Sequence, residues 1–175
     1  MSLVVFDLDG TLVDTRDAVV TAYAEVGIHM PTQAWGRPWQ DWLPGSASLN
    51  GRSAKDVHAA KNRVYPACLA RLARPTPLLT YAAVKQSSVI TGASKEAVEA
   101  IQQQFNVKLN VGGYNMTLND KIYWLNEAYQ SAEDCIYIDD DESTREHVYY
   151  GTHWRPLCPH HAYRLLFLPQ GPTHG

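Results

Sequence analysis

The sequence opens with a run of apolar residues that ends abruptly in acidic ones, LVVFDLDGTL from Leu3 to Leu12. An uninterrupted apolar run predicts a strand buried on both faces, as strands of parallel sheets are. The acidic residues then lie at the carboxyl edge of the sheet, where open α/β folds bind their ligands. Asp7 and Asp9 are two residues apart, so their side chains converge on one point if the chain stays extended. Gly10 permits a sharp turn directly after them.

These two carboxylates favour a functional site over a simple acidic turn. Charged groups at the edge of an apolar sheet are costly to desolvate unless a bound cation or a reaction uses them. A second acidic run follows the apolar residues CIYI, where Asp139, Asp140 and Asp141 come in succession and Glu142 follows them. Like charges this close repel one another, which indicates a bound cation in preference to an acidic loop.

The segment from Asp7 to Thr11 resembles the first motif, DxDGT, of the haloacid dehalogenase-like (HAD) superfamily. The apolar strand that ends at Thr91 matches the second motif, and the backbone amides from Gly92 onward can hold phosphate oxygens. Lys121 matches the third motif. It lies at the start of a predicted helix, where a cation is unfavourable unless it faces an anion. Lys108 is a rival, but it lies within a predicted strand and its spacing to the next motif fits less well.

The acidic run after CIYI resembles the fourth motif in its paired-aspartate form. Asp140 takes the place of the metal-binding aspartate, and Asp139 takes that of the acid or glycine before it. Many members carry another aspartate or asparagine further along, where this chain has Ser143 and Thr144. That departure leaves the outer metal shell open. All four motifs occur in the order of the family.

The predicted elements indicate an α/β fold, since strands and helices alternate along the chain. Such alternation predicts a mainly parallel, doubly wound, Rossmann-like sheet, which is also the fold that the resemblance implies. The expected strands are residues 3–6, 88–90, 107–111, 135–138 and 153–157, and the expected helices are residues 16–26, 78–85, 94–105 and one from about 120.

The segment of residues 31–75 differs in composition from the rest and predicts a small helical cap. It contains three tryptophans, several glycines and a basic helical stretch from about Ser53 to Arg74. We expect a HAD-like core domain of residues 1–30 and 76–158, the cap, and a partly disordered tail of residues 159–175. The resemblance covers the chain from Ser2 to about Leu157, apart from most of the cap.

The bulk composition excludes several classes of protein. A chain of 175 residues suits one domain with a modest insert and needs no disulfide staple. Its three cysteines form neither a metal-ligand pattern nor a disulfide framework, which favours a reducing, cytoplasmic compartment. No apolar run has membrane-spanning length, and Asp7 and Asp9 interrupt the N-terminal run too early for a signal peptide. The sequence does not predict an oligomeric state.

The resemblance implies a Mg²⁺-dependent phosphoric monoester hydrolase. Asp7 is then the nucleophile that forms an aspartyl-phosphate, and Asp9 protonates the leaving oxygen before it deprotonates the hydrolytic water. Mg²⁺ is held by oxygen ligands from Asp7, Asp9 and Asp140, with Asp139 beside them. Thr91 and Lys121 complete the catalytic residues by stabilising phosphoryl oxygens, and the phosphate-binding residues are Gly10, Thr11 and Gly92.

Other activities of the same family fit less well. Dehalogenase members lack an acid at the position of Asp9, and phosphate-transferring ATPases are far longer. A phosphosugar mutase is the nearest alternative, although a mutase generally needs a larger closing cap than about 45 residues. Outside the enzymes, the alternative is a non-catalytic binding protein with this fold. Degenerate members usually lose the nucleophile or the second aspartate, and both are present here.

The composition of the cap gives the only indications of the substrate that we find in the sequence. Its net charge is +5, in a chain whose net charge is −3, and this would attract a phosphorylated substrate. The basic residues of the cap are Arg37, Arg52, Lys55, Lys61, Arg63, Arg71 and Arg74. Trp35, Trp39 and Trp42 either stack a nucleobase or form the cap's own small core. We expect a small phosphorylated metabolite, with a nucleotide monophosphate as the leading prediction. The phosphorylated end of a nucleic acid has thin support, because the whole chain is acidic.

Overall fold

The computed structural model describes residues 2–131 and 134–168 and divides the chain into two compact units. The sheet unit comprises Met1–Val13, Pro75–Lys95 and Val107–Gly175, and the helical unit comprises Asp14–Arg74 and Glu96–Asn106. All residues singled out by the four motifs lie in the sheet unit. The domain boundaries expected from the sequence, after residues 30 and 75, stay a prediction.

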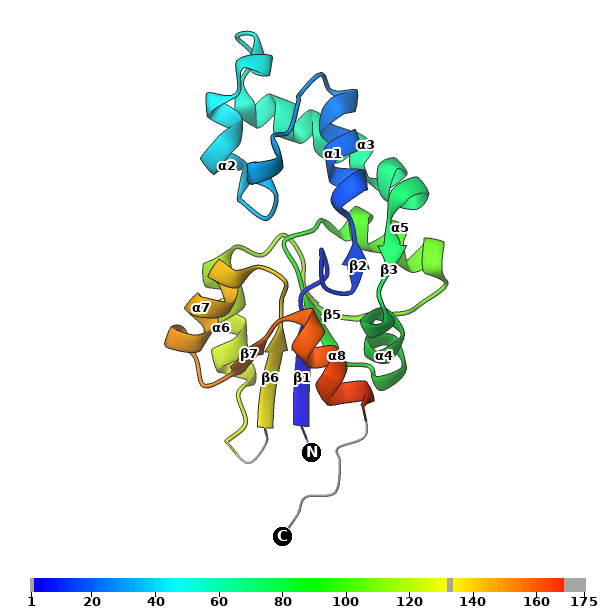
Figure 1. Cartoon of the computed structure of the whole chain (residues 1–175), viewed down its shortest axis with the longest axis vertical. Helices are drawn as coiled ribbons and strands as arrows, with labels where there is room; N and C mark the ends of the chain where they lie inside the picture. Colours follow the sequence, from blue (N-terminus) through cyan, green and yellow to red (C-terminus); the bar gives the residue numbers. More distant parts are fainter. Residues whose placement is uncertain (1, 132–133, 169–175) are drawn as a thin grey trace. The chain divides into compact units, whose positions relative to one another are not determined.

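The sheet unit is built around a five-stranded parallel sheet with the order β5-β4-β1-β6-β7 (Figure 1). This order and the small helical insert confirm the predicted α/β, Rossmann-like class. The strands are β1 (Ser2–Phe6), β4 (Ser88–Ile90), β5 (Asn110–Gly113), β6 (Asp134–Ile138) and β7 (Arg155–Leu157).

Helices α6 (Leu118–Ala128) and α7 (Glu142–Gly151) cover one face of this sheet. The core on that face joins Val5 of β1 and Tyr137 of β6 to Leu125 of α6 and Val148 of α7. All four side chains are fully buried. Burial of such side chains is the main favourable contribution to folding of this unit.

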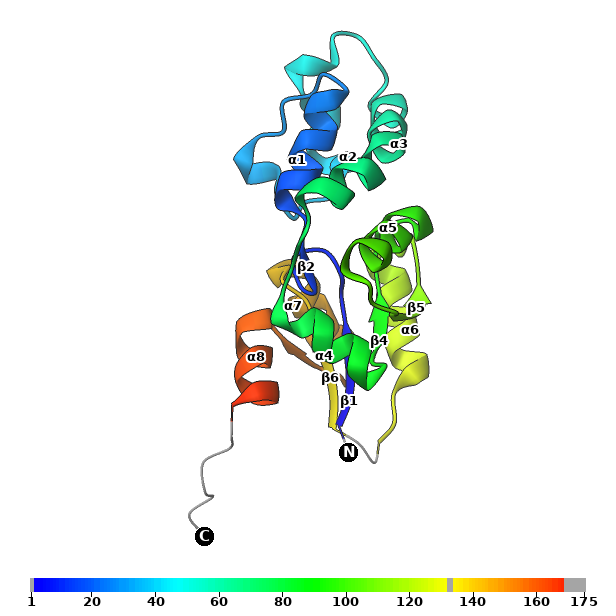
Figure 2. The ribbon, with the colours of Figure 1, turned by 90° about the vertical axis from the view of Figure 1, so that its right-hand side faces the viewer.

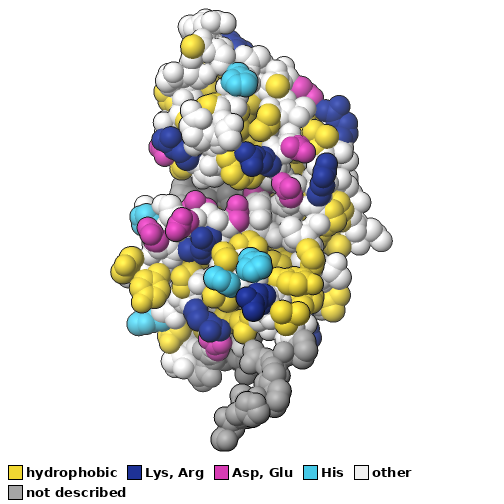
Figure 3. Space-filling view, viewed as in Figure 1, with side chains coloured by type: hydrophobic (Ala, Val, Ile, Leu, Met, Phe, Trp, Pro, Cys, Tyr) yellow, Lys and Arg dark blue, Asp and Glu magenta, His cyan; other side chains and the backbone are white. Residues whose placement is uncertain are grey.

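Helices α4 (Pro77–Lys85) and α8 (Pro159–Phe167) lie on the other face, where Figure 2 shows them side by side. The ring of Phe6 in β1 meets Tyr81 of α4, and Tyr81 meets Phe167 of α8, with ring centroids 6.2 and 5.6 Å apart. Figure 3 shows hydrophobic side chains at the surface over α7 and over α4 and α8. Helix α8 occupies the first part of residues 159–175, for which we expected a partly disordered tail. Residues 169–175 lie outside the described residues.

The register of β1 against β6 decides where the site forms. Val5 pairs with Tyr137, and both side chains belong to the core beneath α6 and α7. Side chains alternate between the faces of a sheet, so Asp7 and Asp139, two residues further on, point toward the same helices. The amide of Asp7 still donates to the carbonyl of Ile138 at 2.8 Å, which continues the pairing to the carboxyl edge.

Three elements begin two or more residues away from their expected start. Strand β5 begins at Asn110 instead of residue 107, so Lys108 lies in the loop before it and not within a strand. Helix α6 begins at Leu118, because Thr117 and Asp120 form a capping box around its first turn. The last strand begins at Arg155 instead of residue 153.

The helical unit has its own core between α1 (Arg16–Glu25) and α3 (Ala54–Leu72). Ser53 caps α3 by accepting the amide N–H of Asp56. The core consists of Tyr23, Ile28, Leu43, Leu49 and Val57. The remaining elements of this unit are η1 (Thr32–Ala34), α2 (Trp39–Trp42), η2 (Leu43–Gly45), η3 (Ala47–Leu49) and α5 (Lys95–Phe105).

The tryptophans of the helical unit pack within that unit. Trp39 stacks on His58, with ring centroids 4.6 Å apart, and Trp42 meets Tyr23 edge-on at 5.0 Å. Trp35 lies beneath the guanidinium of Arg16. Burial, and then the charge of Lys61, lower the pKa of His58 to about 4, so this ring is neutral where it stacks. These contacts favour the second of our two interpretations, in which the tryptophans help to form the insert's own core.

Several basic residues of the segment 31–75 also have partners within the helical unit. Arg52 donates to the carbonyl of Val26 at 2.7 Å and to that of Ser48 at 3.1 Å. Lys61 is buried, and its ammonium lies 3.7 Å from the centroid of the Tyr65 ring. Arg71 pairs with Glu25 and Arg74 with Asp17, as Nη2–carboxylate contacts of 2.8 and 4.0 Å. The net charge of +5 in residues 31–75 is therefore partly engaged by groups within the helical unit.

The chain passes between the two units through β2 (Val13–Asp14) and β3 (Arg74–Pro75), which pair as a two-stranded sheet. Directly after β3, Thr76 binds the segment that precedes β2. Its amide donates to the carbonyl of Leu12 at 2.9 Å, and its hydroxyl lies 2.8 Å from the carbonyl of Thr11. The outgoing and returning segments are thus joined at the sheet unit.

The described helices also bear on membrane association. Among them, none combines the length and the apolar character that a membrane span requires.

The packing of α6 yields a stability prediction. Leu125→Ala removes a fully buried side chain between α6 and the sheet, so the free energy of unfolding should fall by about 2–5 kcal/mol. Urea denaturation followed by circular dichroism measures the change. Val84→Ala on α4 is the control, because Val84 is 74% exposed and its loss should cost less than about 0.5 kcal/mol. Equal losses in both variants would contradict the described core.

Candidate active site

A buried ion pair forms the centre of the site. The ammonium of Lys121 in α6 donates to Oδ1 of Asp7 at 2.7 Å, and both side chains are about one-tenth exposed. Asp7 is placed by the end of β1, and Lys121 by the capping box that fixes the start of α6. The expectation that Lys121 faces an anion at the helix start is therefore met by Asp7.

Asp139 is the second carboxylate that Lys121 contacts, with a distance of 3.4 Å from Nζ to Oδ2. The phenol of Tyr137 donates to the same oxygen at 2.6 Å. The other oxygen, Oδ1, accepts the amide N–H of Asp141 at 2.9 Å. Asp139 is 2% exposed, and both of its carboxylate oxygens accept hydrogen bonds from the protein.

Asp140 points toward the turn that follows Asp7. Its amide donates to Oγ1 of Thr11 at 3.0 Å, and that hydroxyl lies 3.5 Å from Oδ1 of Asp140. Gly10 has a φ of +77°, and a Cβ built there would collide with the Asp140 carboxylate. Glycine is therefore required at position 10 both for its backbone conformation and for this close approach.

The three carboxylates form a group that fits a divalent cation. One oxygen each from Asp7, Asp139 and Asp140 lies within 4.8 Å of the others. Hard cations such as Mg²⁺ take oxygen ligands of this kind. The side chain of Asp9 is not a member of this group, so its predicted contribution to the metal stays a prediction.

The carboxylates are electrostatically crowded in the protein alone. Burial raises the pKa of Asp7 well above its ordinary value against the opposing effect of Lys121, with Asp139 and Asp9 adding to the rise. Burial, and then Asp139, raise the pKa of Asp140 to about 6. Burial lowers the pKa of Lys121, but Asp7 and Asp139 outweigh it, so that lysine keeps its charge. A bound cation would favour the ionised carboxylates.

Thr91 and Gly92 follow β4, the neighbour of β1 in the sheet. Thr91 is fully buried, and its Oγ1 accepts the amide N–H of Ala93 at 3.0 Å. This bond belongs to the turn after the strand. A Cβ at Gly92 would make an ordinary contact with the carbonyl of Met116, so space does not require glycine there. The predicted phosphate contacts of Thr91 and Gly92 stay predictions.

The sequence analysis did not identify two residues that contact the site, Tyr137 and Arg145. Tyr137 is one, and its signal is a polar phenol in an apolar strand, two residues before Asp139. Arg145 in α7 is the other, since its Nη1 donates to the carbonyls of Asp139 and Asp140, both at 2.7 Å. Its signal is the same as for Lys121, a cation near a helix start that is unfavourable without an acceptor.

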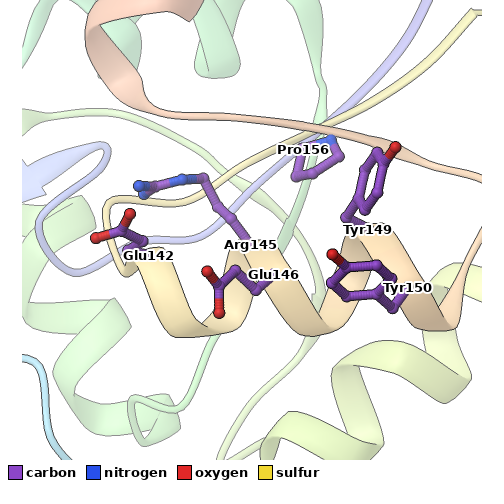
Figure 4. Close-up of a pocket in the computed structure, with 6 residues that line it drawn as sticks. All are labelled: Glu142, Arg145, Glu146, Tyr149, Tyr150 and Pro156. Atoms are coloured by element: carbon purple, nitrogen blue, oxygen red, sulfur yellow. The ribbon is translucent and has the colours of Figure 1, made fainter.

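The loop after Asp140 is held by hydrogen bonds from Thr144 to Asp141 and from Arg145 to the preceding carbonyls. Asp141 caps α7 by accepting the amide and the hydroxyl of Thr144, at 2.8 and 2.6 Å. Arg145 donates to the carbonyls of Asp139 and Asp140, which precede this loop. In Figure 4 its side chain extends toward Glu142 at the start of α7, in a surface pocket whose far end is lined by Tyr149 and Tyr150.

Solved structures share the fold of this chain, whereas no family model and no curated protein sequence matches it. CbbY from Rhodobacter sphaeroides in complex with phosphate has a TM-score of 0.66 at 17% identity, with 90% of this chain and 85% of that chain covered. Another structure of CbbY is a complex with xylulose-(1,5)bisphosphate. A family IA HAD hydrolase from Entamoeba histolytica has a TM-score of 0.66 at 15% identity, with 90% and 83% covered.

A third similar structure is that of Protein Tyrosine Kinase A from Mycobacterium tuberculosis. Its TM-score is 0.62 at 18% identity, with 90% of this chain and 82% of that chain covered. These likenesses confirm that the chain has the fold of the haloacid dehalogenase-like hydrolases, as its motifs predicted. The fold alone does not determine the reaction, because proteins with different named activities share it.

The crowding of the carboxylates yields a prediction about Asp140. Its pKa is higher in the folded protein than its ordinary 3.8, so it ionises more readily in the unfolded chain. Without divalent cations, the protein should therefore lose stability as the pH rises from about 4 to about 6. Asp140→Asn removes this loss and should raise the free energy of unfolding at about pH 7 by about 1–3 kcal/mol.

Urea denaturation in the presence of a chelator measures this difference, which should vanish below about pH 4. Saturating Mg²⁺ should reverse the order, because only the unmutated site gains stability from the bound ion. A metal-free D140N protein that is less stable than wild type at neutral pH would contradict the described electrostatics.

Proposed function

We propose that this protein is a Mg²⁺-dependent phosphohydrolase that acts on a small phosphorylated molecule through an aspartyl-phosphate at Asp7. The observation that carries the proposal is the buried Asp7–Lys121 pair beside Asp139 and Asp140 at the carboxyl edge of the sheet. Open α/β folds bind their ligands at this edge.

The site supplies what a carboxylate nucleophile needs. A carboxylate approaches a phosphate ester against the repulsion of two negative charges, so nearby positive charge must offset it. The ammonium of Lys121 is one such charge, 2.7 Å from Asp7. Mg²⁺, held in this proposal by Asp7, Asp140 and Asp9 with Asp139 beside them, would neutralise the phosphoryl group when bound.

Asp9 is the proposed acid and base. It lies in a turn fixed by hydrogen bonds, with the amide of Gly10 donating to the carbonyl of Val13 at 2.8 Å. This turn begins directly after Asp7. In this proposal Asp9 holds a proton for the leaving oxygen and later accepts one from water. Thr91 accepts the amide of Ala93, and its own hydroxyl hydrogen would donate to a phosphate oxygen.

The proposed substrate class is a small phosphorylated metabolite. CbbY, which shares the fold, was solved with phosphate and with a sugar bisphosphate. A nucleotide monophosphate stays in the proposal as a narrower class. In the sequence, this narrower class was supported by the tryptophans of the insert, which could stack a nucleobase. Two of them, Trp39 and Trp42, pack against His58 and Tyr23 instead.

Phosphate release tests the proposal. Nucleoside monophosphates, sugar phosphates and a generic aryl phosphate are incubated with the protein, with and without Mg²⁺. We expect metal-dependent release that falls below about one-thousandth of the wild-type rate in Asp7→Asn, because the amide is not a nucleophile. Asp134→Asn is the matched control, since Asp134 is half-exposed and pairs with Arg155 away from the site.

The other outcomes separate the alternatives. Full activity in D7N, or release that needs no metal, would contradict the proposed chemistry. Interconversion of a sugar phosphate without net release of phosphate would identify a mutase. If no compound is turned over, the general phosphatase proposal fails. Retained binding of a partner by D7N would then favour a non-catalytic protein.

A further inference from the structure

A buried phenol near the end of β6 has no part in the proposed chemistry. Tyr137 is fully buried in the core that includes Leu125 and Val148. Phenylalanine would fill this space, and burying a hydroxyl is costly unless it is hydrogen-bonded. The hydroxyl donates to Oδ2 of Asp139 at 2.6 Å, a short bond of the charge-assisted kind.

Oδ2 of Asp139 is one of two carboxylate oxygens that the ammonium of Lys121 contacts. Lys121 lies between two carboxylates, 2.7 Å from Oδ1 of Asp7 and 3.4 Å from Oδ2 of Asp139. Its attraction to each oxygen depends on how much of that oxygen's negative charge other donors satisfy. The phenol of Tyr137 donates a hydrogen bond to Oδ2 of Asp139 and so reduces the attraction of that oxygen for Lys121. The shorter of the two Lys121 distances is accordingly the one to Asp7.

We propose that Tyr137 is a positioning residue, which donates to Asp139 and thereby keeps the ammonium of Lys121 on Asp7. The proposal rests on the proposed function, because it is the attack by Asp7 that needs this charge. Asp139 then acts chiefly as the counter-charge that orients Lys121. Its other oxygen is already engaged by the amide of Asp141 at 2.9 Å.

Tyr137→Phe tests the proposal, because it keeps the ring and removes only the donor. Lys121 should shift toward Asp139, and kcat for the aryl phosphate should fall about 10-fold or more. KM and the half-saturating Mg²⁺ concentration should stay within about twofold, because the substrate and metal contacts are unchanged. Unchanged kcat would overturn the proposal, and so would a loss confined to Mg²⁺ affinity.

A second variant separates positioning from general destabilisation. In an Asp139→Asn background the competing charge is absent, so adding Y137F should change kcat by less than about twofold. If Y137F lowers kcat as much there as in the wild type, its effect is structural and the proposal fails.

Tyr23→Phe in the helical unit is the matched control. Tyr23 is also buried, and its phenol lies 3.1 Å from Nδ1 of His58. Its loss should affect stability in a similar way to that of the Tyr137 phenol. We expect kcat for the aryl phosphate to be unchanged in Y23F, and a fall like that of Y137F would overturn the proposal.

Crystal structures of wild type and Y137F give a readout that does not depend on turnover. The distance from Nζ of Lys121 to Asp7 should lengthen from 2.7 Å, and the distance to Asp139 should shorten from 3.4 Å. Unaltered distances would overturn the proposal. If wild type releases no phosphate, the proposed function fails on its own, and the structures still decide whether Tyr137 positions Lys121.

Discussion

One lysine shared between two buried carboxylates is the interaction on which the site depends. Removing three charges from water is expensive, and their mutual attraction compensates only when the geometry is well defined. Here the geometry comes from ordinary elements: the β1–β6 register places Asp7 beside Asp139, and a capping box fixes the helix that carries Lys121. The apolar sheet core beneath these residues holds the ends of the strands in place. The site is therefore formed where β1 and β6 end and where α6 begins. The apolar core between the sheet and α6 stabilises these elements.

Most of the fold and the main acidic residues could be predicted from the sequence, because these depend on local patterns. An apolar run ending in Asp7 defines a parallel strand without knowledge of its neighbours. The hydrogen bond from Tyr137 to Asp139 was not predicted although the two residues are close in sequence, because a tyrosine in an apolar strand resembles any other core residue until the partner of its hydroxyl is known. Residues 107–111 were expected to form a strand, but pairing with β4 begins only at Asn110. Tertiary pairing overrode local propensity there.

The helical insert shows a different limit of sequence analysis. Composition gives the number of charges and aromatic rings but not their partners. Arg52 uses its guanidinium on backbone carbonyls, and Lys61 is covered by the ring of Tyr65. A positive net charge in such a segment therefore overstates the field that a substrate would meet. The same holds for Trp39, whose face is occupied by His58.

The clamp that Thr76 makes on Thr11 and Leu12 has a topological consequence. These hydrogen bonds join the two ends of the segment Asp14–Arg74, so this segment forms one closed loop between two neighbouring points of the sheet unit. The entropy of closing a flexible loop grows only with the logarithm of its length, by about 0.6 kcal/mol for each doubling. A scaffold closed in this way tolerates inserts of very different size. Evolution or an engineer can therefore exchange the segment between the clamp residues while the strand that leads to Asp7 keeps its place.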